Sequence, residues 1–428
     1  MGWMHTMNTP KKNNVERYLP YMATVWFFVV LNSYLIWNPL APVMHVLPAI
    51  LIAVGTSAIS KKLNSTKNAH TLIFCMSVYF LWVLMLLSDN FATVVRRFVD
   101  FMPFICIILW PKELIVKTYR IIRKVVVFFA IGSAILSILI LLGFGERLPH
   151  IVLPAREALH EKVGIVYNLY VFFIANVHPT IGISCRACGM LQEPGHFAIL
   201  LGYIYVIERL GYNKINYWII ICGLLTFSSA FLLIMAFSEL YQFFSLQNIK
   251  KILYISTILF FSVIVIYNYL PSSVQEQITF FAYGRNLESV VEAFKETASL
   301  TGALDERASD HAIALYNKLS TTQYLFGGGN KEAGEMLSDF RGMILHIGLL
   351  GLLLSILSYI VLLKGVPMKL KIALGGAYFL VAIHRAWILY LPYLFFLAYL
   401  AVVLYRMNNR VSYAVKLQNS KKAVVKRL

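Results

Sequence analysis

The chain has 428 residues, of which 59% are hydrophobic and only 14% are charged, and its mean hydropathy is +0.70. This composition excludes a water-soluble globular protein, because too few polar side chains are present to cover a surface that faces water. The formal net charge is +18, but the cations lie between apolar segments, as membrane topology requires, so nucleic acid is not expected as a partner. The composition predicts the lipid bilayer as the partner.

Apolar runs long enough to cross a hydrocarbon layer of ~30 Å recur along the chain. We expect an all-α, polytopic integral membrane protein with one membrane domain over residues 1–428, because lipid cannot satisfy the backbone of an open sheet. The first run lacks a small-residue cleavage site and is expected to remain as a span. In chain order, the twelve predicted spans are Leu19–Ile36, Leu40–Ile59, Thr71–Leu87, Phe91–Trp110, Val125–Leu142, Pro194–Ile207, Ile215–Thr226, Ala230–Leu246, Ile252–Leu270, Gly342–Leu363, Ile372–Ile383 and Trp387–Tyr405.

The distribution of basic residues predicts the orientation of these spans. With the N-terminus inside, the segments on the cytoplasmic side hold 25 of the 38 Lys and Arg residues. The excess is clearest in the short segment Pro111–Lys124 and in the basic tail 406–428, where the positive-inside rule has most force. Both termini are therefore expected in the cytoplasm.

Two segments on the outer side, 143–193 and 271–341, are too long to be simple connections, so function is expected there. The first is apolar between Val163 and Ile183, which predicts a re-entrant or interfacial helix. The second has the spacing of an amphipathic helix, with apolar residues at i, i+3, i+4 and i+7. These residues are Leu287, Val290, Val291 and Phe294.

The common catalytic motifs are missing from suitable places: we find no Walker P-loop, no Rossmann glycine pattern, no H-E-x-x-H and no G-x-S-x-G. There is no Asp-x-Asp pair either, the usual holder of a metal on a sugar-nucleotide or sugar-phosphate donor. We therefore expect a metal-independent reaction and no cofactor. The C-x-x-C of Cys185 and Cys188 has no second Cys pair beside it, so neither a redox nor a zinc role is expected.

Several arginines lie at or near the outer ends of predicted spans. Arginine suits phosphate, because its planar fork of N–H donors stays charged at any relevant pH. The alternative is that each is a solvated residue or an anchor to lipid headgroups. Arg385 lies almost at the start of an apolar run, where an unpaired cation costs ~3 kcal/mol, so we expect it to have an anionic partner. The set is Arg186, Arg285, Arg307, Arg341 and Arg385.

Two residues are candidates for a general base. Glu193 precedes Pro194, a good first residue of a helix; it is either a plain helix cap, a base, or an anchor that orients Arg186. His311 lies four residues after Arg307, on the same helix face, and imidazole accepts protons near neutral pH. The alternative for His311 is an ordinary surface histidine.

Two further features have both a structural and a functional interpretation. The run Gly327–Gly329 predicts a turn at which bare backbone could approach a ligand. Glu239 lies inside an apolar run, and a proton-coupled transporter needs such an acid. Because no matching acids are evident in other spans, we expect Glu239 to be a paired or snorkelled structural carboxylate.

The stretch Arg186-Ala-Cys-Gly189-Met-Leu-Gln-Glu193-Pro194 ahead of a span resembles the Arg-x-x-Gly-x-x-x-Glu-Pro pattern of the Wzy-type O-antigen and capsular polysaccharide polymerases, within the O-antigen ligase/polymerase superfamily. Leu225-Thr226-x-Ser228 is similar to a recurring span end in these proteins. The order of Arg307, Phe326-Gly-Gly-Gly and a span opening at Arg341, followed by His384-Arg385, also fits. The resemblance covers the second half of the chain.

The resemblance implies a GT-C-like membrane glycosyltransferase of the bacterial inner membrane. Its substrates are oligosaccharide units on undecaprenyl diphosphate, joined at the outer face, with a chain-length regulator as a candidate partner. It implies diphosphate binding by Arg186, Arg285, Arg307 and Arg385, and a base at His311 or Glu193. A diphosphate leaving group needs positive charge rather than a general acid, which the arginines supply without a metal.

Two alternatives stay open. An O-antigen ligase shares donor and fold but transfers the glycan to lipid A core. A lipid-linked oligosaccharide flippase or another transporter belongs to a different class, and would be expected to carry charges within many spans and internal pseudo-repeats.

Overall fold

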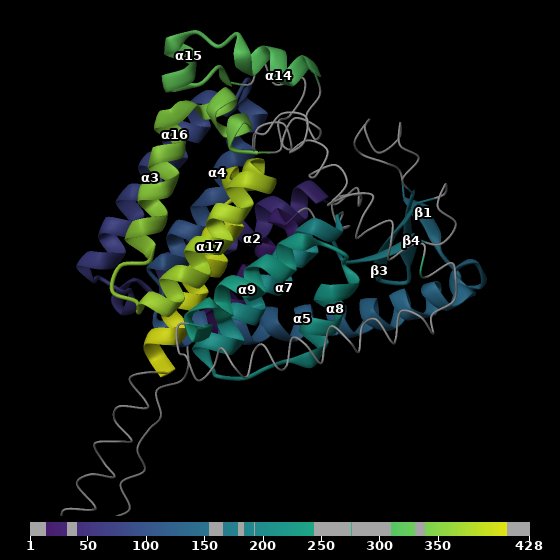
Figure 1. Ribbon diagram of the computed structural model, residues 1–428. Coiled ribbons are helices and arrows are strands. Elements are labelled where there is room, and N and C mark those ends of the chain that lie inside the picture. The colour runs from purple at the N-terminus through teal and green to yellow at the C-terminus, as the bar shows by residue number, and fades with distance from the viewer. Residues whose placement is uncertain are drawn as a thin grey trace, which may run out of the picture.

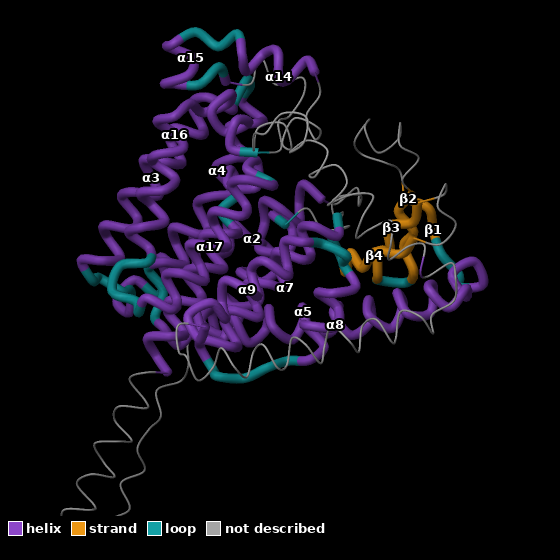
Figure 2. The backbone as a smooth tube through the Cα atoms, viewed as in Figure 1, coloured by secondary structure: helices purple, strands orange, loops and turns teal. Residues whose placement is uncertain are grey.

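The computed structural model describes residues 14–31, 41–153, 166–178, 184–191, 193–243, 275, 310–329 and 339–408, and this part of the chain is mostly helical (Figures 1 and 2). Eleven of the twelve predicted spans coincide with a helix, and the ninth, Ile252–Leu270, lies outside the described residues. The eleven helices are α1 (Asn14–Val30), α2 (Ala41–Ala58), α3 (Lys67–Leu87), α4 (Phe91–Ile108), α5 (Lys112–Leu139), α7 (Pro194–Val206), α8 (Tyr217–Leu225), α9 (Ser229–Phe243), α16 (Phe340–Leu362), α17 (Met368–His384) and the C-terminal helix Tyr393–Asn408.

Within the described residues, three helices are long and apolar enough to cross a membrane by length and composition: α3, α16, and α5 with its continuation to Phe144. Short helical pieces complete the helical part. They are η2 (Ser60–Lys62), η3 (Ile140–Phe144), η4 (Gly145–Arg147), η6 (Ile207–Gly211), α14 (Asp310–Asn317), α15 (Thr321–Phe326) and η9 (Ala386–Tyr390).

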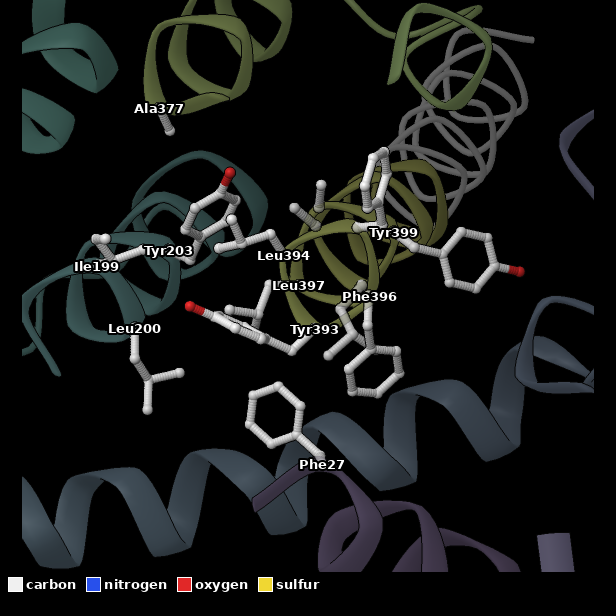
Figure 3. Packing of buried hydrophobic residues seen from close by; sticks show 14 of the residues in the cluster. Phe27, Ile199, Leu200, Tyr203, Ala377, Tyr393, Leu394, Phe396, Leu397 and Tyr399 are labelled. Atoms are coloured by element: carbon white, nitrogen blue, oxygen red, sulfur yellow. The ribbon is translucent and has the colours of Figure 1, made fainter. Parts of the chain in front are cut away.

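The C-terminal helix runs through the core. Figure 3 shows its side chains Tyr393, Leu394 and Leu397 between α7 and Phe27 of α1. The ring centroids of Phe27 and Phe396 lie 5.3 Å apart, and residues 394–398 are at most 1% exposed. This burial places the C-terminal helix at the centre of the helical bundle, one of the two places suited to a helix that is apolar on all sides.

Helix α16 is broken at Gly348, whose φ of 71° and ψ of 173° are not helical. The break leaves carbonyls without their helical partners, and neighbours replace them. The backbone N–H of Gly328 donates to Leu345 O at 2.8 Å, and Trp82 Nε1 of α3 donates to Ile347 O at 2.8 Å. The loop after α15 is thereby fixed to the start of α16.

The expectation of an all-α fold is wrong for the segment 143–193. This segment forms a four-stranded antiparallel sheet in the order β1 (Ile151–Leu153), β2 (Val166–Tyr170), β3 (Phe173–His178) and β4 (Ser184–Gly189). The sheet lies beside the end of α5 (Figures 1 and 2). Phe173 packs against Phe129 of α5 with ring centroids 5.7 Å apart. Residues 166–178, the described part of the stretch where a re-entrant or interfacial helix was predicted, form the hairpin of β2 and β3 instead.

The physical reason is the length and type of the apolar runs. Strands β2 and β3 have five and six residues, rich in Val, Ile, Tyr and Phe, which favour a pleated surface. Tyr170 pairs with Phe173, so a two-residue turn joins the strands, and Val171 within it has a φ of 56°. A run interrupted by so tight a turn is too short for a helix but suits a hairpin.

The bundle has two distinct ends. At the α15 end, α3 stops, α16 and α7 start and α17 stops. The other, the basic end, gathers cationic contacts between segments distant in sequence. These are Lys62 with Glu16, Lys117 with Arg17 O, Arg123 with Glu208, Arg209 with Glu239, and Arg406 with Lys364 O.

Candidate functional site

Glu193 lies at the junction where β4 leads into α7, at the α15 end. Pro194 occupies the first helical turn, and Glu193 itself has an extended backbone, with φ of −127° and ψ of 141°. Its side chain makes no capping hydrogen bond. It is 5% exposed, and its Oε2 lies 3.0 Å from Nη2 of Arg385. The carboxylate therefore forms an ion pair across the bundle instead of capping its own helix.

Arg385 ends α17, where its backbone N–H donates to Val381 O at 2.8 Å. Its side chain is 37% exposed, whereas that of Glu193 is 7% exposed. The predicted anionic partner of Arg385 is thus confirmed. Gly195 lies next to the guanidinium, and a Cβ there would be in ordinary van der Waals contact with Nη2 at 3.8 Å. A buried carboxylate holding a half-exposed guanidinium leaves N–H donors of the fork for an added anion.

His196 adds a second polar group to the same turn of α7. Its Nε2 lies 3.8 Å from Oε2 of Glu193, and the side chain is buried. Tyr393, at the start of the C-terminal helix, interacts electrostatically with Glu193 and Arg385. The pair therefore lies where α7, α17 and the C-terminal helix meet. Neither His196 nor Tyr393 was a candidate from the sequence; an i, i+3 spacing of Glu193 and His196 was the available signal.

Arg186 approaches the same junction from β4. Its Nε donates to Thr226 O and its Nη2 to Phe227 O, both at 3.0 Å. These carbonyls belong to the end of α8, where Phe227 has a φ of 46°. Within the described contacts, Arg186 is thus oriented by a helix end, while the ion pair of Glu193 goes to Arg385. An anchor role of Glu193 toward Arg186 stays a prediction, beside the ion pair that Glu193 forms with Arg385.

The remaining predicted residues lie on or before α14. Arg285 and Arg307 lie outside the described residues, as does the amphipathic pattern Leu287–Phe294. His311 is in the first turn of α14, with a side chain that is not described. Helix α14 packs on Leu345 of α16 through a small apolar cluster, so the backbone that carries His311 lies over the start of α16. The cluster consists of Ile313, Leu315, Tyr316 and Leu319.

Two features named from the sequence have structural roles here. A Cβ at Gly327 would lie 2.6 Å from His346 O, so the glycine run approaches the broken part of α16. The approach of this backbone to a ligand stays a prediction, and the structure shows Gly327 packed against α16. Arg341 is buried and donates to Asp339 through Nε at 3.1 Å and Nη2 at 2.7 Å. Its charge is already neutralised within the chain.

The structure also reveals buried charges that the sequence interpretation missed. Asp100 of α4 is 3% exposed, and its Oδ1 lies 2.6 Å from Nε2 of His45 on α2. Glu208, equally buried, pairs with Arg123 of α5. The statement that acids are absent from other spans is therefore wrong, because Asp100 lies inside the predicted span Phe91–Trp110. Asp100 was overlooked because the residues around it in this span are mostly apolar.

Glu239 has the structural role expected for it. Arg209 donates to its two oxygens at 2.8 and 3.2 Å, and the Tyr205 hydroxyl donates at 2.9 Å. This carboxylate is paired. Cys188, of the C-x-x-C, is buried, and its thiol donates to Arg186 O at 3.4 Å. Among the described residues, no three His, Cys, Asp or Glu side chains are close enough to hold a metal ion.

The site thus unites segments that are far apart in sequence: the stretch 186–196, the end of α8 and the end of α17. Its chemistry is that of a half-exposed cation held by a buried acid. A second arginine, Arg186, lies on β4, the strand that leads into α7. No protein-family model matches the chain, and comparisons with curated protein sequences and with solved structures give no match.

Proposed function

We propose that the chain is a membrane glycosyltransferase that polymerises oligosaccharide units carried on undecaprenyl diphosphate. One observation supports this most: the ion pair between Glu193 and Arg385 joins the two stretches whose patterns resemble the polymerases. A guanidinium that is 37% exposed and fixed by a buried carboxylate suits a diphosphate, which needs a pre-oriented cation as its charge develops. The twelve-span, GT-C-like arrangement is part of the same proposal.

The orientation follows from charge. Lysines and arginines gather at the basic end of the bundle, which the positive-inside rule assigns to the cytoplasm. The α15 end, with Glu193 and Arg385, then faces outward. Both termini are cytoplasmic in this arrangement, and the enzyme acts at the outer face of the bacterial inner membrane, where lipid-linked units are displayed.

In the proposed reaction, a hydroxyl of the acceptor sugar attacks the anomeric carbon of the donor. The new glycosidic C–O bond forms as the bond from that carbon to the diphosphate breaks, and the diphosphate leaves with the electron pair. Arg385, with Arg186 nearby, stabilises the leaving group. The hydroxyl proton passes to a base. Glu193 is engaged by Arg385, which favours His311 as the base and Glu193 as a positioning residue.

The test is polymerisation of purified lipid-linked units by wild-type protein and Arg385 variants. Arg385→Ala should lose most product, and Arg385→Lys should lose less, because it keeps the charge but not the planar fork. Arg96→Ala is the matched control, since this arginine of α4 is exposed. Wild-type-like polymer from Arg385→Ala would remove Arg385 from the reaction.

The base is tested by two variants in the same assay. His311→Ala should lose turnover but keep donor affinity, whereas Glu193→Gln should weaken donor affinity through Arg385. The opposite pattern would assign the base to Glu193. Supplying lipid A core as the acceptor separates the ligase alternative: a ligase transfers glycan to it, and a polymerase extends only lipid-linked units.

A second candidate function, transport of a lipid-linked oligosaccharide, is favoured by the buried pair of His45 and Asp100, since acids inside a helical bundle mark ion and substrate pathways. Purified protein in liposomes is the test. Movement of a lipid-linked unit between leaflets without chain growth, lost in Asp100→Asn, would support transport. Chain growth without such movement would exclude it.

A further inference from the structure

Arg97 of α4 is a cation that the proposed reaction does not use. It precedes Asp100 by three residues and Phe101 by four, so all three lie on one helix face. That face is turned into the bundle, because Asp100 is 3% and Phe101 0% exposed, and Phe101 stacks on Phe80 of α3 with centroids 4.7 Å apart. Arg97 is partly buried on this face, while its neighbour Arg96 is exposed.

The surroundings of Arg97 are polar and come from four elements. Arg97 interacts electrostatically with Asp100, Tyr79 of α3 and Tyr390 of η9, and with His346 of α16. The rings of His346 and Tyr390 meet edge to face at 6.0 Å. Both tyrosine hydroxyls donate to backbone carbonyls, Tyr79 to Leu389 O at 2.9 Å and Tyr390 to Gly342 O at 3.0 Å. These bonds fix the rings around Arg97.

The N–H donors of Arg97 in this cluster are not taken up by the described residues. Asp100 is the acid within it, and its Oδ1 is already 2.6 Å from His45 Nε2. Arg97 makes no hydrogen bond and no ion pair within 4.0 Å to any described residue. His346 is 3% exposed, and its ring nitrogens make no hydrogen bond of ordinary geometry to the described residues, although the ring lies beside the backbone of Gly329. A partly buried guanidinium with unused donors is a binding group for an anion.

The cluster and the Glu193–Arg385 site share one short segment. Helix η9, Ala386–Tyr390, follows Arg385 directly and ends at Tyr390, which interacts electrostatically with Arg97. At the rise of a 3₁₀-helix, five residues span roughly 10 Å. Two anion sites at opposite ends of η9 are thus close enough for two bound sugars to meet, yet far enough apart for two separate diphosphates.

We infer that Arg97, with His346 and Tyr390, binds the diphosphate of a second lipid-linked sugar, the acceptor, while Arg385 binds that of the donor. This inference rests on the proposed polymerisation, in which both substrates carry a diphosphate and both must be held at once. The recognised chemistry is a diphosphate monoester on a long lipid; an ordinary phospholipid headgroup carries a phosphate diester and is the competing source.

Native mass spectrometry of the purified full-length protein tests this by counting bound lipids. The probe is undecaprenyl diphosphate, with phosphatidylglycerol in a separate arm. Wild-type protein should bind two molecules of undecaprenyl diphosphate. Arg97→Gln and Arg385→Gln should each lose one, with the affinity of the lost site falling about tenfold or more. Arg96→Gln, the neighbouring exposed arginine, should still bind two. The molecule that remains in each single variant reports that the variant is folded.

The outcomes separate the inference from the proposed function. Two molecules bound to Arg97→Gln would overturn the inference, as would equal binding of phosphatidylglycerol at the Arg97 site. One molecule on wild-type protein, lost only in Arg385→Gln, would overturn it and leave the polymerase proposal intact. No binding to wild-type protein would overturn both. If Arg97→Gln does not fold, Arg97→Lys carries the test, with a tenfold weaker second site expected.

Discussion

Helix α7 and its continuation η6 have an ion pair at each end. One pair has the features of a binding site, and the other has the features of a purely structural contact. At the basic end, Arg209 donates to both oxygens of Glu239, and Tyr205 donates a third bond. At the α15 end, Arg385 approaches Glu193 through one nitrogen at 3.0 Å, and its side chain is 37% exposed against 21% for Arg209. Each of the three nitrogens of Arg209 donates a hydrogen bond, whereas Arg385 pairs with Glu193 through Nη2 and keeps donors for a ligand.

The comparison shows that the role of an ion pair in this bundle depends on how many hydrogen-bond donors it leaves without a partner. A fully hydrogen-bonded pair mainly fixes the position of two helices. A pair with one buried and one half-exposed partner fixes the exposed partner in place and leaves it reactive toward anions. By this criterion Arg341, which is held by Asp339, belongs with Arg209. Arg97 resembles Arg385 only in its unused donors, because it makes no ion pair within 4.0 Å to any described residue.

The sharpest test of the comparison is activity. If the proposed reaction is correct, Arg385→Ala should lower turnover about 100-fold or more, because a donor to the leaving group is removed. Arg209→Ala should leave turnover per folded molecule within about twofold. Both are measured on purified protein with lipid-linked units, normalised to the monodisperse fraction. Equal losses in the two variants would show that the two ends of α7 do not differ.

Stability should show the reverse order. Glu208→Gln removes the carboxylate that pairs with Arg123 at the basic end, and we expect the free energy of unfolding to fall by about 2 kcal/mol. This is less than for a fully buried pair, because the Arg123 side chain is 40% exposed. Glu193→Gln should cost less than about 1 kcal/mol. Unfolding of both variants in the same detergent measures this, and a larger cost for Glu193→Gln would contradict the comparison.

The hydrogen bond from Tyr205 to Glu239 can be removed without changing the ion pair of Arg209 and Glu239. Tyr205→Phe deletes the hydroxyl that donates to Glu239 at 2.9 Å and should lower the free energy of unfolding by about 1 kcal/mol, the usual net value of one such bond. Tyr217→Phe is the control, since Tyr217 of α8 is 71% exposed and should change stability very little. If the free energy of unfolding of Tyr205→Phe equals that of the control variant, the Tyr205 hydroxyl does not contribute to holding Glu239.

The smallest effect is expected from two glycines of α7. A Cβ at Gly195 would lie 3.8 Å from Arg385 Nη2, an ordinary contact, whereas one at Gly202 would lie 3.0 Å from Ile234. Gly195→Ala should therefore keep both stability and turnover, aided by the helix propensity of Ala. Gly202→Ala should lose about 1 kcal/mol through crowding of a packed interface. Thermal unfolding and turnover of the two variants check this. An inactive Gly195→Ala would indicate that residue 195 lies closer to Arg385 than the structure shows.

The helices were largely predictable because each one depends on the residues of a single continuous segment. An apolar run ended by charged or turn residues becomes a helix whatever surrounds it in a nonpolar medium. The sheet was not predictable by the same rule. Residues 163–183 are as apolar as a short span, and only the tight turn at Val171, with its positive φ, decides for strands. That turn is formed by pairing with neighbouring strands, which local composition does not contain.

The members of the site were also identifiable, in part. Glu193 and Arg385 were candidates because each is a charge at the edge of an apolar run. Their pairing was not, because it joins two helix ends distant in sequence. Arg97 and Asp100 were overlooked for a related reason: hydropathy averaged over a span conceals two charges whose helix face is turned inward.

The sequence by itself determined an apolar composition that suits a membrane, the positions of most helices and the residues able to carry charge at helix ends. These depend on composition and on periodicity within single segments. Only the tertiary structure decided which distant charges meet, namely Glu193 with Arg385 and Asp100 with His45, and which guanidiniums keep unused donors. The strength and the role of a charged group depend on its burial and on its partners in space, and these come from the packing of helices rather than from any one of them.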